Sequence, residues 1–225
     1  MMRTVVLGCW AAFFWWLSFS GEVTRYLGPR TQWVSWFGAV GLTLATVVLF
    51  SLDRSRRSTR FEAVPIAIML LPLAAVLAAP AADLGAHAVS RKASAGGLAA
   101  GAVLVAEDVD EMGFREIALA GRSADFALRL GVGEGMDIDL FGFVSNTKTV
   151  GFELARFYVS CCAADAIPYA VLVEPSVTLD PRGTQRYDID EWLRVKGALI
   201  QRGDAFVVVA DEIRRSEEPK DPYLY

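Results

Sequence analysis

Histidine is almost missing from this chain of 225 residues, which contains only His87. Because no histidine follows His87, a Ser-His-Asp or Cys-His catalytic arrangement cannot be assembled from the second half of the chain. A zinc-protease helix motif is excluded for the same reason, and no G-x-x-x-x-G-K-[ST] phosphate loop occurs. The glycine-rich run 131–135 lacks the later glycine of a dinucleotide loop, so we interpret it as a turn. We therefore expect the protein not to be an enzyme.

Charged residues are missing from three long apolar runs, at residues 4–20, 33–52 and 63–82. The composition is 54% hydrophobic with a mean hydropathy of +0.36, which is too apolar for an ordinary soluble domain. About 20 apolar residues are needed to cross a bilayer as a helix. The sequence therefore predicts three transmembrane helices, of which the first is short. A cleaved signal peptide is the alternative interpretation of that first run.

The charges that are present divide the chain into a basic and an acidic part. Residues 1–82 contain seven Lys and Arg against three Asp and Glu, and most acidic residues follow. Four arginines lie in residues 53–61, so the positive-inside rule predicts that this loop is cytoplasmic. The part after residue 82 is then extracytoplasmic, in a multi-pass membrane protein. Its acidic balance argues against nucleic acid as a partner.

The second half of the chain has the pattern of a small all-β domain. We expect a transmembrane region at residues 1–89, a linker of small residues at 90–106 and an extracytoplasmic β domain at 107–225. Short alternating segments bounded by turn residues predict five strands. These lie at residues 136–144, 152–160, 169–174, 191–201 and 205–213. Gly142 and Gly197 interrupt two of them, which indicates bulges or tight bends. An OB-like barrel is the fold we expect, and a small sandwich is the alternative.

Cysteine is scarce as well, yet two of the three cysteines, Cys161 and Cys162, are adjacent. The residues that follow them are poor strand formers, so we expect the pair where a strand ends and a turn begins, with both sulfurs on one side. Three interpretations remain open: small thiols packed in a turn, a site for Cu(I) or Zn²⁺ with Asp165, or a redox-active pair. Asp165 is equally suited to hydrogen-bond its own turn.

The run RFYVSCCAADAIPYAVLVE at residues 156–174 carries a family resemblance, together with LFGFV before it and EWLRVKG after it. With YLGPR near residue 28, LPLAAVLAAP near residue 75 and the terminal PYLY, these segments resemble the YcgQ-like family of bacterial membrane proteins. The resemblance implies a membrane region followed by an extracytoplasmic β domain. The motif residues that it carries over include Arg156, Phe157, Cys161, Cys162, Asp165 and Trp192.

The same resemblance implies a role as an accessory subunit beside a multi-span permease of the YcgR type. The expected partners are therefore that permease and the lipid bilayer. The alternative function is a stand-alone, membrane-anchored protein for thiol redox chemistry or soft-metal handling. A thiophilic metal ion at Cys161, Cys162 and Asp165 is the cofactor that the residues themselves suggest.

Overall fold

The computed structural model describes residues 2–53, 63–78, 84–94, 113–121, 124–180, 186–203 and 205–225. Contacts divide the chain into two units. The helical unit comprises residues 1–83, the short segment 160–165 and Tyr225. The sheet unit comprises residues 84–159 and 166–224. Each unit is described by itself.

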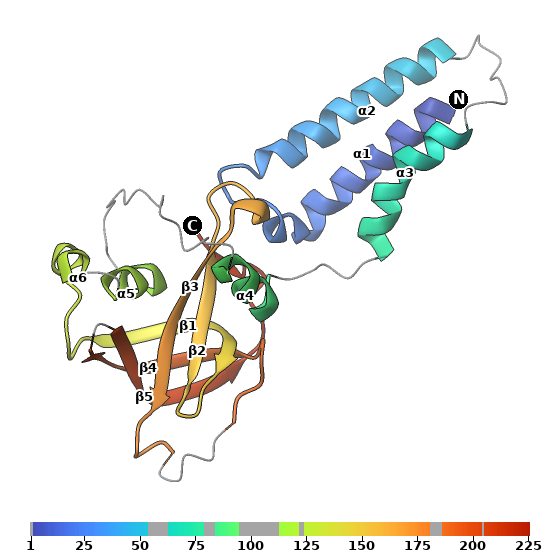
Figure 1. Ribbon diagram of the computed structural model, residues 1–225. Coiled ribbons are helices and arrows are strands. Elements are labelled where there is room, and N and C mark those ends of the chain that lie inside the picture. Colours follow the sequence, from blue (N-terminus) through green and yellow to red (C-terminus); the bar gives the residue numbers. More distant parts are fainter. Residues whose placement is uncertain are drawn as a thin grey trace. The chain divides into compact units, whose positions relative to one another are not determined.

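The helical unit contains the three apolar runs as helices. They are α1 (Met2–Ser20), α2 (Trp33–Asp53) and α3 (Ala63–Ala78), with a short 3₁₀ helix, η1 (Glu22–Arg25), after α1. Helices α1 and α2 run antiparallel (Figure 1). Polar side chains join them, because the Ser18 hydroxyl donates to Ser35 at 3.1 Å and the Trp15 indole donates to Thr43 at 3.1 Å. Such interhelical hydrogen bonds are typical of helices that associate in lipid.

Within the described residues, one helix is long and apolar enough to cross a membrane: the stretch Trp33–Leu52 of α2. Its 20 residues correspond to about 30 Å of helix, the thickness of a bilayer core. The other two predicted spans contain shorter apolar helices, at Thr4–Ser20 and Ala67–Val76. The end of the third predicted span lies outside the described residues. Length and composition thus support one of the three predicted spans.

Pro72 lies inside α3 and leaves one helical carbonyl without its usual donor. Close to this position, the Trp10 indole of α1 donates a hydrogen bond of 3.2 Å to the Met69 carbonyl oxygen. This hydrogen bond connects α3 with α1.

The sheet unit begins with three short helices, α4 (Ala86–Ser94), α5 (Phe114–Ala120) and α6 (Ala124–Leu130). Helix α4 crosses the boundary predicted at residue 89, and residues 95–106 of the predicted linker lie outside the described residues. Six strands follow. They are β1 (Asp137–Thr147), β2 (Phe152–Tyr158), β3 (Ile167–Pro175), β4 (Trp192–Arg202), β5 (Ala205–Ser216) and β6 (Tyr223–Leu224). All five predicted strands are confirmed, and β6 is additional.

The strand pairings of the sheet unit form a cycle. Strand β1 pairs antiparallel with β2 and with β4, β4 pairs antiparallel with β5, and β2 pairs antiparallel with β3. The parallel pairing of β3 with β5 completes the series, which therefore returns to β1. The short strand β6 pairs parallel with β2, where Phe157 faces Tyr223. The strands cross one another in the lower part of Figure 1.

The two strand glycines behave differently. The register between β4 and β5 shifts at Lys196 and Gly197, so the predicted bulge is confirmed there. Gly142 pairs regularly with Leu193, and the irregularity of β1 lies further on, after Val144. At Gly142 a Cβ atom would lie 2.5 Å from the Ala155 carbonyl oxygen, so the glycine allows a close backbone approach instead of a bulge.

The main core of the sheet unit lies between the strands and is covered by α5. Alternation in β1 and β4 turns Ile138, Leu140, Leu193 and Val195 inward, all at 3% exposure or less. Helix α5 adds Phe114 and Ile117 to the same cluster. Burial of alternate residues along each strand is what the period of two in the sequence predicted.

Candidate functional site

The adjacent cysteines lie in a loop of residues 160–165, called here the thiol loop. Strand β2 ends at Tyr158, the chain bends at Ser160 and Cys161, and a 3₁₀ turn, η2 (Ala163–Asp165), precedes β3. Pro168 favours an extended conformation for the residue before it, which helps β3 to begin at Ile167. The cysteines therefore follow the end of a strand and enter a turn, as the sequence predicted.

Asp165 closes the thiol loop from its far end. One carboxylate oxygen accepts the N–H groups of Ser160 at 3.2 Å and Cys162 at 3.4 Å, and the other accepts the N–H of Cys161 at 2.8 Å. Partial burial acts to raise the pKa of Asp165, but hydrogen bonds from Cys161, Cys162 and Ser160 outweigh it and lower that pKa. The side chain is therefore an ionised carboxylate at neutral pH. It hydrogen-bonds its own turn, which was one of the two roles considered for it.

The two thiols lie side by side beside this carboxylate. Both are free, Cys161 is exposed and Cys162 is half-buried, and their sulfur atoms are 3.6 Å apart. The Asp165 carboxylate, which accepts a hydrogen bond from the thiol, and the neighbouring Cys162 together raise the pKa of Cys161 to about 12. Cys161 is thus a protonated thiol at neutral pH. Reactive, nucleophilic cysteines have lowered pKa values, so this environment is not typical of one.

The loop collects three possible metal ligands in one place. One atom each from Cys161, Cys162 and Asp165 can be chosen such that all three lie within 4.8 Å of one another. Two sulfurs and one carboxylate oxygen form a ligand set that suits zinc or another thiophilic ion, with one tetrahedral position left open. An ion bound there would displace the thiol protons, since the metal ligand is the thiolate.

The segment between α1 and α2 holds the backbone of the thiol loop. The Cys161 carbonyl oxygen accepts the N–H of Gly28 at 3.1 Å and the hydroxyl of Thr31 at 2.5 Å. The Ala163 N–H donates to the Tyr26 carbonyl at 2.9 Å, and Leu27 forms a β-bridge with Cys162. These contacts fix the backbone on both sides of the cysteines.

The supporting residues 26–31 were not predicted as part of the site. Gly28 is buried, and a Cβ atom there would lie 3.3 Å from both the Ser160 carbonyl oxygen and the Tyr225 ring. The signal in the sequence was the YLGPR run, which contributed to the family resemblance, but the resemblance gave this run no role.

The other three motif residues have structural roles in the sheet unit. The Arg156 guanidinium donates to the carbonyl oxygens of Asp221 and Pro222, each at 3.2 Å, and lies over the ring of Trp192 at 6.0 Å. Phe157 is 1% exposed and stacks on Phe143 with ring centroids 5.9 Å apart. Arg156 therefore holds the C-terminal segment, and Phe157 fills a core.

Comparison with known proteins finds a match for one part of the chain. No curated protein and no solved structure matches the chain. Residues 130–225 match the family described as the DUF1980 C-terminal domain. This segment includes the thiol loop and all six strands. The match carries no information about the YcgQ name or a paired permease, which stay predictions. The comparison therefore finds similarity to a DUF1980 C-terminal domain at residues 130–225, which is less than half of the chain.

Proposed function

We propose that the protein is a membrane-anchored metal-handling protein that binds a thiophilic ion at the thiol loop. The observation that carries this proposal is the convergence of two thiols and one carboxylate within 4.8 Å on a loop with a fixed backbone. The carboxylate has its negative charge beside the two sulfurs, where a cation would lie. Cys161 is exposed and the site offers three ligands, so the ion that it holds would be exchangeable with solvent or with a partner.

The spacing of the sulfurs favours a tetrahedral ion. Two sulfurs at 2.3 Å from a tetrahedral zinc would be roughly 3.8 Å apart, close to the 3.6 Å between Cys161 and Cys162. Sulfurs on opposite sides of an ion at the same bond length would be about 4.6 Å apart, which would require the loop to open. We therefore expect the loop to bind zinc with tetrahedral coordination. The alternative is Cu(I) with linear coordination.

The two other interpretations of the cysteine pair receive less support from the loop. A packing role requires buried thiols, whereas Cys161 is exposed. A redox role requires a thiolate that attacks a disulfide, whereas the pKa of Cys161 is raised to about 12. Metal binding has neither difficulty, because a bound cation itself replaces the thiol proton.

We further propose the membrane arrangement and the strand architecture that the sequence predicted. In this arrangement α1, α2 and α3 all span the bilayer, and the sheet unit lies outside the cytoplasm. The cyclic pairing of β1 to β5 supports an OB-like barrel as the scaffold of the sheet unit. A multi-span permease as the partner that exchanges the ion rests on the family resemblance alone. Co-purification of a permease with the tagged full-length chain would test that partner.

Metal binding is tested by competition titration of the full-length protein in detergent, with a chromophoric chelator and Zn²⁺. We expect one ion per chain in the wild type and at least a 100-fold weaker affinity in the variant Cys161→Ser/Cys162→Ser. Asp165→Asn is expected to weaken binding about 10-fold, because it removes the charge and keeps the shape. Cys9→Ser is the matched control and should bind like the wild type. Equal affinity of the wild type and the double cysteine variant would reject the proposal.

A further inference from the structure

The thiol loop is attached to one particular end of the α1–α2 pair. Its contacts go to Tyr26, Leu27, Gly28 and Thr31, all in the segment that joins the two helices. The candidate membrane span begins at Trp33, two residues after Thr31. If α2 spans a bilayer, the thiol loop is therefore tied to the position where the chain enters the hydrocarbon region.

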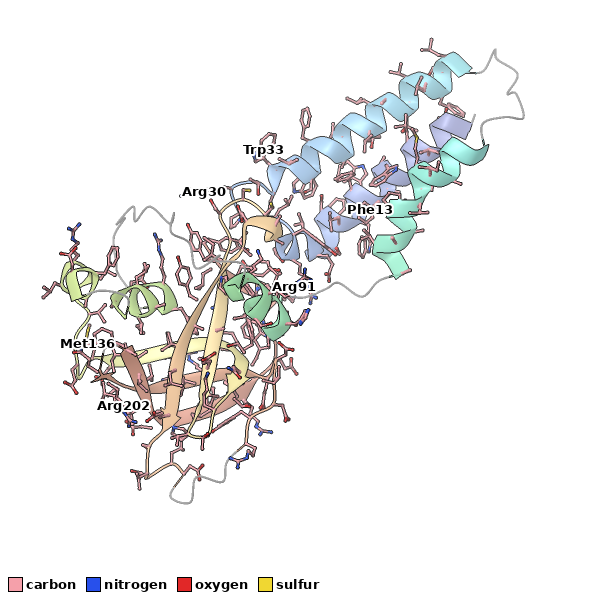
Figure 2. All side chains as sticks on the ribbon, in the orientation of Figure 1. Phe13, Arg30, Trp33, Arg91, Met136 and Arg202 are labelled. Atoms are coloured by element: carbon pink, nitrogen blue, oxygen red, sulfur yellow. The ribbon has the colours of Figure 1, made fainter. Side chains whose placement is uncertain are left out.

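Large aromatic side chains surround the same end of the two helices, and we call them the aromatic collar. Phe19 is 72% exposed and Trp33 is 63% exposed. Phe19 and Trp36 meet edge to face with centroids 5.3 Å apart, and Trp33 and Phe37 do so at 6.3 Å. Figure 2 labels Trp33 near the start of α2, with Arg30 beside it. The collar consists of Trp16, Phe19, Trp33, Trp36 and Phe37.

The collar has the chemistry of a surface that faces phospholipid. Exposed aromatic side chains of this size are unfavourable in water, whereas indole rings are stable at the boundary between headgroups and acyl chains. The collar continues into the exposed apolar residues of α2, such as Val40 and Leu44. The exposed Arg30 lies just before the span, where a guanidinium complements lipid phosphate.

We propose that the aromatic collar and Arg30 dock onto the phospholipid headgroup layer and thereby hold the thiol loop at the bilayer surface. This inference rests on the proposed membrane anchor. It adds that the metal site lies at the lipid–water interface, so its ion is exchanged next to the membrane. The partner surface is the lipid itself. The hydrogen bonds that the Gly28 N–H and the Thr31 hydroxyl donate to the Cys161 carbonyl set the depth of the loop.

Depth measurements in vesicles of phosphatidylcholine and phosphatidylglycerol test the proposal. A nitroxide is attached at Ala164→Cys in a chain with Cys9→Ala, Cys161→Ser and Cys162→Ser, and its accessibility to oxygen and to a water-soluble paramagnetic complex is compared. We expect a depth at the headgroup layer. A label at Leu44→Cys in the same background is the reference and should report the bilayer centre.

A second measurement keeps the native cysteines. Lipids brominated at different acyl positions quench the tryptophans of the wild type and of Trp33→Phe, and the difference reports Trp33. The shallowest bromine should quench this difference at least twofold more than the deepest one. A label at residue 164 free in water, or a Trp33 quenched best by the deepest bromine, would overturn the proposal. Both measurements omit metal, so failure of metal binding would leave their outcome unchanged.

Discussion

The two units of the protein place the same kinds of apolar side chain in opposite positions. In the helical unit, Phe37 and Leu44 of α2 are 72% and 62% exposed. In the sheet unit, Leu193 and Val195 of β4 are completely buried. A bilayer would give exposed side chains of the first kind an apolar surrounding. The comparison indicates that the helical unit is suited to lipid and the sheet unit to water.

Polar groups follow the reverse arrangement. Ser35 is 1% exposed between α1 and α2, where its hydroxyl meets Ser18. In the sheet unit, charged pairs such as Arg194 with Asp139 lie on the surface. The helical unit buries polar groups, and the sheet unit buries apolar groups. The same kind of substitution should therefore change the stability of the two units differently.

Truncation of an apolar side chain should give the largest difference in stability effect between the two units. Phe152 is 1% exposed and packs against the Tyr187 ring at 4.6 Å, so Phe152→Ala should cost about 3–5 kcal/mol of the unfolding free energy of the sheet unit. Leu44→Ala, on the outer face of α2, should leave that free energy within about 0.5 kcal/mol of the wild type. Denaturant unfolding of the full-length protein in micelles, followed by hydrogen exchange of β1 and β4, measures both. Similar losses for the two variants would contradict the comparison.

Removal of Arg156 should release the C-terminal segment of the sheet unit. Its guanidinium donates to the carbonyl oxygens of Asp221, Pro222 and Tyr223, so we expect Arg156→Ala to cost about 1.5–3 kcal/mol. Faster hydrogen exchange at Tyr223 and Leu224, and faster removal of C-terminal residues by carboxypeptidase, would show the release.

A matched control for this prediction is Arg129→Ala. Arg129 is highly exposed and forms an ion pair within α6, with Asp125. We expect no change in exchange at β6. Protection of Tyr223 that is unchanged in Arg156→Ala would show that the guanidinium does not hold this segment.

Much of the fold follows from local patterns, and the rest depends on contacts between distant residues. The period of two predicted β1 to β5, and uncharged runs predicted the helices. Strand β6 has only two residues and forms by pairing with β2 next to Phe157. A strand this short has no alternating pattern that would predict it from the sequence. The order of pairing is likewise a property of the whole sheet, because a strand pattern identifies its buried face and not its neighbours.

The candidate site divides in the same way. Small residues and Asp165 after the cysteine pair predicted a turn, and the structure has this turn. The partner of that turn could not be predicted, because Thr31 and Cys161 are 130 positions apart and meet through a backbone carbonyl. Every residue has a backbone carbonyl, so the residue type at position 161 does not predict this contact. Gly28 was visible only as part of a Gly-Pro pair between two apolar runs.

A smaller effect is expected from the polar contact inside the helical unit. Ser35→Ala should weaken the association of α1 with α2 by about 0.6 kcal/mol, the average for such hydrogen bonds in membrane proteins. A double-mutant cycle with Ser18→Ala in bilayers measures the coupling directly. Ser51→Ala is the control, since that exposed hydroxyl bonds the Val47 carbonyl of its own helix. A coupling energy of zero would show that the Ser18–Ser35 contact does not stabilise the pair.

The smallest effect concerns the surface charges of the sheet unit. The hydrogen bond from Arg194 lowers the pKa of Asp139 below its ordinary value of 3.8, although slight burial opposes this. Because the folded-state pKa is the lower one, the stabilisation is present above the unfolded-state value and is lost as the pH falls through the folded-state value. Asp139→Asn should therefore flatten the dependence of Tm on pH below about pH 4. An unchanged slope would show that the pair does not contribute.

X-ray absorption at the zinc edge of the Zn²⁺-loaded, full-length protein tests metal binding at the thiol loop most directly. Ligation by Cys161, Cys162 and Asp165 predicts two sulfur neighbours at about 2.3 Å and oxygen neighbours at about 2.0–2.2 Å. The sulfur contribution should disappear in Cys161→Ser/Cys162→Ser. A zinc shell in the wild type with only oxygen and nitrogen neighbours would contradict the proposed site.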